Sequence, residues 1–275
     1  MFEFAFMQRT FIVAACLGVM IPLIGLIMIN RKTSMVGDAL SHTSLAGVGL
    51  GLILGFDPGL GATLICIVSA FAIEALRKHF PQYGDMATAV IMSLGLGIAS
   101  ILSDFAPGGN SLESYLFGSI SSATETDVIA VSIVCLLIIL LFTFNYSGML
   151  YISVNTNLAR LAGVNITLAN GLFTLLTAIT VALSCKTVGA LLVASLLVLP
   201  VATVLFLARS YKQLVLGSVF LGLLYMLCGI TLSWHFNLKP GGAIVLLAII
   251  GIVSVAAISG FRKPEDLKLN TEKIH

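Results

Sequence analysis

Asp38 and His42 are the residues of this sequence whose types and spacing could bind a metal ion. They lie in the segment Ser34-Met-Val-Gly-Asp-Ala-Leu-Ser-His-Thr-Ser-Leu-Ala-Gly, which an apolar, glycine-rich run follows as far as Gly55. Ionisable side chains are costly beside lipid, so those that occur there usually face the inside of a helix bundle and have a function. Four residues apart on a helix, the carboxylate and the imidazole share one face. Together they could contact a divalent cation.

Simpler interpretations of this pair are open as well. Asp38 lies near the expected start of its helix and could be a cap or an interfacial charge, and His42 could be a hydrogen-bonded core residue. Two ligands are fewer than the four of a structural zinc site. A two-fold dimer would supply two Asp and two His, and a transported ion must be able to leave its site. Asp38 could instead orient His42 without touching the ion.

Helical geometry gives this segment two specialised faces. At about 100° per residue, Ser41 and Gly49 fall on the same side as Asp38 and His42. We therefore expect one polar face whose backbone is bare at Gly49. Glycines spaced by four form a ridge on the other side, which is suited to close helix packing: Gly47, Gly51 and Gly55. A helix with a polar face and a packed face is typical of a transport pathway.

Composition places the pair in a membrane protein. Of the 275 residues, 59% are hydrophobic and only 9% are charged, and the mean hydropathy is +1.10. Soluble domains carry about 25% charged residues, so we predict an all-α integral membrane protein with one transmembrane domain over residues 1–275. Continuous apolar runs of about 20 residues are typical of spanning helices and not of a β-barrel. We expect eight or nine spans, from runs at residues 11–29, 36–55, 59–76, 86–103, 128–144, 168–185, 188–208, 213–234 and 242–261.

The basic residues predict the orientation of these spans. Cytoplasmic loops carry an excess of Lys and Arg. With the N-terminus outside and the C-terminus in the cytoplasm, 11 of the 14 basic residues lie on the cytoplasmic side and three lie outside. The cytoplasmic set is Arg31, Lys32, Arg77, Lys78, Arg160, Arg209, Lys212, Arg262, Lys263, Lys268 and Lys273, and the outer set is Arg9, Lys186 and Lys239.

Segments outside the spans also have expected roles. Residues 104–127 form a long outer connection whose acidic residues, Asp104 and Glu113 among them, indicate either a solvated loop or a docking surface that attracts cations. In the inner loop, residues 155–163 have a cap, a few apolar residues and a closing glycine, which predict a short amphipathic helix at the cytoplasmic surface. Residues 1–10 are expected at the membrane interface, and 262–275 as a charged cytoplasmic tail.

Other motifs are less specific or absent. Pro200 stands inside an apolar helical run and removes one backbone hydrogen bond there. The resulting kink could line a path, act as a hinge or serve packing alone. The five cysteines form no CxxC pair and are expected to be small core residues. The sequence holds no G-x-x-x-x-G-K-[ST] loop and no HExxH. We therefore expect no enzyme activity in this chain, and ATP-driven transport would need another subunit.

Several stretches, in order along the chain, carry a resemblance to a known family. They are Phe6-Met-Gln-Arg, the segment around Asp38 and His42, Leu112-Glu-Ser-Tyr-Leu-Phe-Gly, Asn157-Leu-Ala-Arg-Leu-Ala-Gly-Val, Val188-Gly-Ala-Leu-Leu-Val and Leu199-Pro-Val-Ala-Thr. With these stretches the chain resembles the membrane permease subunit of ABC importers for zinc, manganese and iron. The Gly-Asp-x-x-x-His and Leu-Pro-x-Ala-Thr blocks are the most specific part of the match.

The resemblance implies an assembly and a mechanism. The permease would be a homodimer in the cytoplasmic membrane of a prokaryote, working with two cytoplasmic ATP-binding subunits and an extracytoplasmic metal-binding protein. Transport would be by alternating access, with the ion passing Asp38 and His42 along the dimer axis. The family usually has an acidic residue near position 157, where this chain has Asn. The residues that would couple to the ATPase are Asn157, Leu158, Ala159, Arg160 and Gly163.

The resemblance also bears on the substrate. The segment Ser41-His-Thr-Ser-Leu-Ala-Gly is more similar in sequence to the corresponding segment of the family's zinc members. Zinc is therefore the favoured metal, with manganese or iron as alternatives. The metal is cargo, and we expect no permanently bound cofactor and no nucleic-acid partner. A membrane anchor that does not transport and a secondary transporter are the alternatives from other classes of protein.

Overall fold

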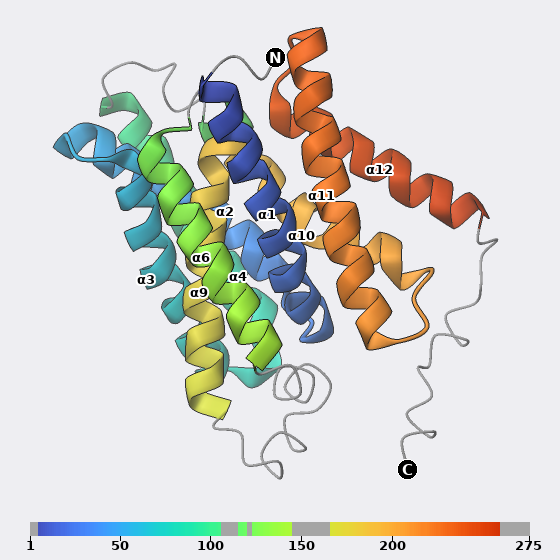
Figure 1. Ribbon diagram of the computed structural model, residues 1–275. Coiled ribbons are helices and arrows are strands. Elements are labelled where there is room, and N and C mark those ends of the chain that lie inside the picture. Colours follow the sequence, from blue (N-terminus) through green and yellow to red (C-terminus); the bar gives the residue numbers. More distant parts are fainter. Residues whose placement is uncertain (1–4, 106–114, 120–122, 145–165, 259–275) are drawn as a thin grey trace.

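The structure, a computed structural model, describes residues 5–105, 115–119, 123–144 and 166–258. All regular secondary structure in these ranges is helical (Figure 1), which confirms the predicted all-α class for this part of the chain. The long helices are α1 (Ala5–Asn30), α2 (Ser34–Leu54), α3 (Pro58–His79), α4 (Gly84–Phe105), α6 (Glu125–Phe144), α9 (Ile166–Thr187), α10 (Ala190–Leu205), α11 (Tyr211–Phe236) and α12 (Pro240–Ile258).

Each predicted apolar run corresponds to one of these helices, but fewer of them qualify as membrane spans. Among the described residues, seven helices have the length and hydropathy to cross a membrane: α1, α3, α4, α6, α9, α11 and α12. The α10 helix is apolar but has only 16 residues. The α2 helix carries Asp38, His42 and several glycines, which lower its hydropathy.

Local sequence signals set the ends of the helices around α2. The α2 helix stops at Gly55, which adopts a left-handed conformation at φ 75° and donates its N–H to the Gly51 carbonyl. Asp57 then caps α3 by accepting a hydrogen bond from the Gly59 N–H at 2.7 Å, and Pro58 occupies the first helical position. This tight turn brings α3 back against α2.

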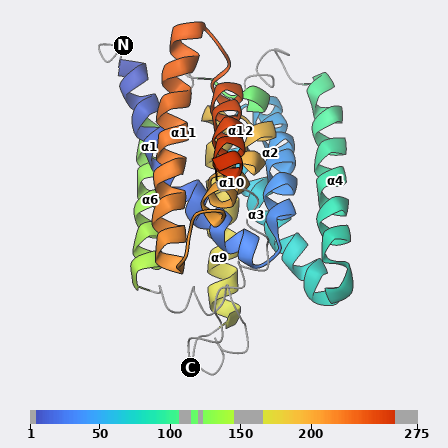
Figure 2. The same cartoon turned by 90° about the vertical axis from the view of Figure 1, so that its right-hand side faces the viewer.

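The α2 helix is central in the bundle, where it packs against α3, α4, α9 and α10. The α1 helix packs against α6, α10 and α11, and its middle is almost completely buried. Figure 2 shows α4 at one edge of the bundle, with α1, α6 and α11 toward the opposite edge. The helix that holds Asp38 and His42 is therefore positioned by four neighbours.

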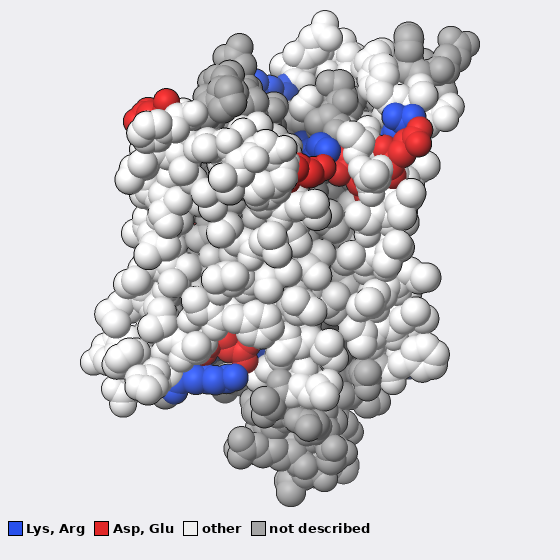
Figure 3. Space-filling view, turned by 90° about the vertical axis from the view of Figure 1, so that its left-hand side faces the viewer, with Lys and Arg blue, Asp and Glu red and all other residues white. Residues whose placement is uncertain are grey.

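Charged side chains gather at the two ends of the bundle. Figure 3 shows a broad band without Lys, Arg, Asp or Glu between them on the face that it displays. At the end where α1 begins, Lys186 lies 2.6 Å from Asp127 and Arg9 pairs with Glu125. At the other end, Lys78 lies 2.9 Å from Glu74. An uncharged middle between charged ends is what a lipid bilayer requires.

The start of the chain, expected at the membrane interface over residues 1–10, is described from Ala5 onward. From Ala5 onward these residues are the first turns of α1, and the Met7 side chain is fully buried. That this stretch lies at the membrane interface stays a prediction. The charged tail 262–275 lies outside the described residues.

Candidate functional site

Asp38 and His42 lie on consecutive turns of α2, near its start at Ser34. The Nε2 atom of His42 is 3.6 Å from the Oδ1 atom of Asp38, and the side chains are 16% and 37% exposed, respectively. This separation is longer than a hydrogen bond, so the two groups are near one another without being bonded. Both could turn their lone pairs toward a shared cation.

The two nitrogens of His42 have different surroundings. The Nδ1 atom is buried and has no hydrogen-bond partner in the structure, whereas Nε2 faces the Asp38 carboxylate. Among the described residues, no group of three or more His, Cys, Asp or Glu side chains is close enough to hold a metal. One copy of this part of the chain therefore offers a metal two ligands from α2 and no third.

Two residues expected on the same open face are covered by neighbouring atoms. The Ser41 side chain is fully buried, and its hydroxyl donates a hydrogen bond to the Gly37 carbonyl at 2.8 Å. A Cβ added to Gly49 would lie 3.1 Å from the Leu102 Cβ of α4. The expectation of a bare backbone beside the pair was therefore wrong, because α4 packs over the far end of this face.

The three glycines of the expected ridge have different positions. A Cβ on Gly47 would lie 2.3 Å from the Gly61 carbonyl oxygen, and one on Gly51 would lie 2.7 Å from the Pro58 Cα. These two glycines lie directly against the backbone of α3. Gly55 has no other atom within 4 Å of such a Cβ, so it ends α2 and does not pack, contrary to the expectation.

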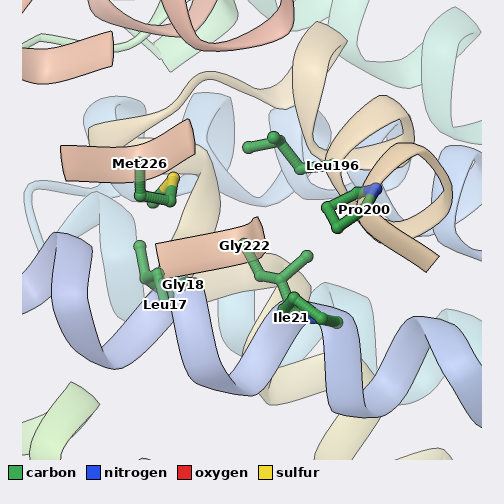
Figure 4. A pocket seen from close by; sticks show the side chains of 8 residues that line it. Leu17, Gly18, Ile21, Leu196, Pro200, Gly222 and Met226 are labelled. Carbon is green, nitrogen blue, oxygen red and sulfur yellow. The ribbon is translucent and has the colours of Figure 1, made fainter. Parts of the chain in front are cut away.

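Pro200 lies inside α10 and is buried. It lines a small, partly open apolar cavity between α1, α10 and α11 (Figure 4). Pro22, the proline inside α1, lines the same cavity. Two helices that each lack a backbone hydrogen bond therefore meet at this cavity. The remaining lining residues are Leu17, Gly18, Ile21, Leu196, Gly222 and Met226.

Two buried cysteines make polar contacts that no sequence motif indicated. The Cys185 Sγ of α9 lies 3.1 Å from the Ser44 Oγ, and the Cys66 thiol of α3 donates to the Leu40 carbonyl at 3.3 Å. Both cysteines are fully buried, as expected for core residues. Their contacts fasten α3 and α9 to α2, and no motif announces them because the partners belong to different helices.

The remaining predicted site residues lie at the ends of helices or outside the described ranges. Asp104 is exposed near the end of α4. The structure does not describe Glu113 or the proposed coupling residues, Asn157, Leu158, Ala159, Arg160 and Gly163. Residues 115–119 of the outer connection pack on the turn between α9 and α10, where a Cβ on Gly118 would lie 2.4 Å from the Thr187 carbonyl oxygen.

The apolar helices and the uncharged middle of the bundle (Figure 3) define a multi-pass membrane protein. The chain belongs to the ABC 3 transport family, whose pattern matches residues 3–259, and is thus a permease subunit of the metal ABC importers. It is 29% identical over 249 residues to the manganese transport system membrane protein MntC of Listeria monocytogenes, covering 90% of this chain and 89% of that protein.

Other relatives are named for zinc and not for manganese. The chain is 29% identical over 265 residues to the high-affinity zinc uptake system membrane protein ZnuB of Buchnera aphidicola, covering 94% of this chain and 99% of that one. A solved structure of PsaBC from Streptococcus pneumoniae, in complex with Fab, has a TM-score of 0.81 and 29% identity. That match covers 99% of this chain and 96% of the solved one.

Proposed function

We propose that this chain forms, as a homodimer, the pathway of an ATP-driven importer that moves a divalent transition metal, with zinc favoured, into the cytoplasm. The observation that carries the proposal is the Asp38–His42 pair: a carboxylate and an imidazole 3.6 Å apart and partly exposed on α2. No third ligand joins them among the described residues. Two copies across a two-fold axis would supply the four ligands that a tetrahedral ion takes.

An incomplete shell suits an ion in transit. A site that bound the metal as tightly as a structural zinc site would hold it and stop transport. With two ligands from each chain, the shell is complete only while both copies of α2 face the axis. In an alternating-access cycle, moving the two helices apart would open the shell and release the ion. Asp38 and His42 bind the cargo in this scheme, and no resident metal is required.

Other chains supply the energy and the metal. The sequence has no phosphate-binding loop of the usual kind, so ATP hydrolysis belongs to separate cytoplasmic ATP-binding subunits. Residues 155–163 would contact those subunits. An extracytoplasmic metal-binding protein would deliver the ion at the opposite end, where Asp104 and Glu113 would form part of its docking surface. This chain is then a permease and not an enzyme.

The proposed topology has eight or nine spans, because α2 and α10 lie inside the bundle beside the seven apolar helices. A helix enclosed by other helices does not need a lipid-compatible surface along its whole length. The N-terminus is outside and the C-terminus is in the cytoplasm, as the excess of basic residues in the inner loops indicates. The relatives described above are bacterial, which supports the cytoplasmic membrane of a prokaryote as the location.

Zinc is favoured on the chemistry of His42. Imidazole nitrogen is a better ligand for zinc than for harder ions such as manganese, which prefer carboxylate oxygen. Asp38 supplies an oxygen ligand as well, so the pair would also accept manganese or iron. The names of the relatives divide between manganese and zinc and do not decide between these metals. The preference for zinc therefore rests on the His42 imidazole and on the amino-acid sequence of residues 41–47.

The test is uptake of radioactive zinc by the complete importer in proteoliposomes, with ATP inside. Asp38→Ala and His42→Ala should each abolish uptake while the ATP-binding subunits remain assembled. Asp85→Ala and His79→Ala are matched controls, because both residues are exposed in or near the turn between α3 and α4. These controls should transport like the wild type.

Other outcomes point to other functions. Wild-type uptake by both pathway variants would overturn the role of the pair and favour an anchor that does not transport. Uptake by this chain alone, without ATP, would indicate a secondary transporter. Stronger competition by manganese or iron than by unlabelled zinc would correct the choice of metal.

A further inference from the structure

Glu74 of α3 is a largely buried carboxylate that contacts a second helix. Its side chain is only 19% exposed, and its Oε1 atom lies 2.9 Å from the Lys78 Nζ. Its Oε2 atom accepts a hydrogen bond from the Thr174 hydroxyl of α9 at 2.7 Å. The i,i+4 pair with Lys78 follows from helical spacing, but the bond to Thr174 joins the last part of α3 to the third turn of α9.

Arg31 contacts the residue of α9 that is adjacent to Thr174. Its guanidinium lies over the Phe173 ring, 5.5 Å from the ring centroid, and Phe173 precedes Thr174 directly. Burial lowers the pKa of Arg31, the nearby Glu74 carboxylate raises it, and Arg77 lowers it. Arg31 is in the short connection between α1 and α2, three residues before α2 begins at Ser34.

These contacts exclude a cation site at Glu74. Both carboxylate oxygens already have partners, and the positive charges of Lys78 and Arg31 act on the carboxylate. A divalent ion would have to displace Lys78 against this charge. The cluster joins the connection before α2, the end of α3 and the first half of α9.

We infer that Glu74 and Arg31 are positioning residues that transmit movement of the start of α9 to α2, and so to Asp38 and His42. The inference rests on the proposed function, in which the segment immediately before α9 contacts the ATP-binding subunits. A shift of Phe173 and Thr174 would pull on Arg31 and Glu74. Arg31 lies seven residues before Asp38, and α3 is fastened to α2 by the close contact of Gly47 with Gly61.

An ion-pair network at the opposite end provides a matched comparison. Asp127 of α6 is 21% exposed, lies 2.6 Å from the Lys186 Nζ of α9, and accepts a hydrogen bond from the Thr124 hydroxyl at 2.6 Å. The burial and bonding resemble those of Glu74, but Asp127 is far from the start of α9. A loss of stability alone should therefore be similar for both carboxylates, whereas a loss of transmission should be specific to Glu74.

The first measurement is zinc uptake and ATP hydrolysis in the same proteoliposomes containing the complete importer. Glu74→Gln keeps an oxygen for Thr174 but removes the charge, and Thr174→Val removes the hydroxyl. Each should lower the zinc moved per ATP by about fivefold or more, the lower range of measured coupling between sites. Arg31→Lys, which keeps the charge, should fall between them and the wild type. Asp127→Asn should lower the Tm while keeping the wild-type ratio.

A second measurement does not depend on transport. Spin labels at Met35 of α2 and Leu168 of α9, which are 64% and 61% exposed, report the distance between these helices once Cys16 and Cys228, the native cysteines that are not buried, are replaced. Addition of a non-hydrolysable ATP analogue should change this distance in the otherwise wild-type complex and not in Glu74→Gln. An equal change in both complexes, or an unchanged ratio of zinc to ATP in Glu74→Gln, would overturn the inference. Absence of uptake by the wild type would overturn the proposed function and leave the distance test in place.

Discussion

Gly47 of α2 and Gly61 of α3 lie backbone against backbone. A Cβ on either residue would come within 2.3 Å of the carbonyl oxygen of the other, closer than real side chains approach. Small residues at such crossings let helices in membranes approach closely enough for backbone van der Waals contact. The helix that carries Asp38 and His42 is therefore held by α3 along its second half, and the pair moves only if α3 moves with it.

Gly47→Ala should destabilise the protein. The added methyl group would clash with backbone atoms of Gly61 and Ala62, and overpacking of this kind costs about 1–3 kcal/mol. The measurement is the Tm of the purified protein in detergent. Gly97→Ala in α4 is the control, because nothing lies within 4 Å of a Cβ there. It should keep or raise the Tm, since Ala is the better helix former. Equal effects of the two substitutions would contradict the close crossing.

Hydrophobic length predicted the helices of this fold well, because it is a local property. A run of about 20 apolar residues forms a helix wherever it packs, since unpaired backbone groups cannot be left in lipid. The sequence could not predict the order in which helices pack. That Thr174 would meet Glu74, or that Ser44 would meet Cys185, depends on contacts between residues about 100 and 141 positions apart.

The same limit explains the errors at the candidate site. The spacing of Asp38 and His42 sufficed to place them on one face, because a single turn of helix joins them. Helical geometry also placed Gly49 on that face correctly, but it could not show that α4 covers the face there with Leu102. A helical wheel gives the direction of a side chain and gives no information on what lies opposite.

Pro200→Ala should lower the rate of metal uptake without lowering the Tm. Pro200 has no N–H to donate to the Leu196 carbonyl four residues earlier, and both residues line the cavity that Pro22 shares. Ala would restore the missing bond and straighten α10, so the Tm should be unchanged or higher. If α10 bends during transport, the uptake rate should fall by about tenfold, equivalent to ~1.4 kcal/mol in the barrier.

Pro240→Ala serves as the control for Pro200→Ala. Pro240 is the first residue of α12, where a proline replaces no helical hydrogen bond. This variant should transport at the wild-type rate. A normal uptake rate in Pro200→Ala as well would show that the proline of α10 is a packing feature without a role in movement.

Two ion pairs at the end where α1 begins should differ in their contribution to stability. The Lys186 and Asp127 side chains are 17% and 21% exposed, whereas those of Arg9 and Glu125 are 36% and 75% exposed. Asp127→Asn removes the charge opposite Lys186 and should cost about 1–3 kcal/mol. Glu125→Gln should cost less than about 1 kcal/mol, because water already screens the pair. The comparison of the two Tm values tests this order, and a larger loss in Glu125→Gln would contradict it.

Tyr115 should make stability fall at alkaline pH. Burial, followed by the Asp57 and Asp127 carboxylates, raises the pKa of this phenol from 10.0 to about 12. The folded protein therefore keeps a proton that the unfolded chain loses above pH 10. By linkage, this contribution to stability is fully present below about pH 10 and is lost progressively as the pH rises toward about 12.

Tyr115→Phe cannot ionise, so its Tm should fall less between about pH 9 and about pH 11 than that of the wild type. Tyr83→Phe, at an exposed position, should keep the wild-type loss, and identical pH profiles for Tyr115→Phe and the wild type would show that the Tyr115 phenol is solvated in the folded protein.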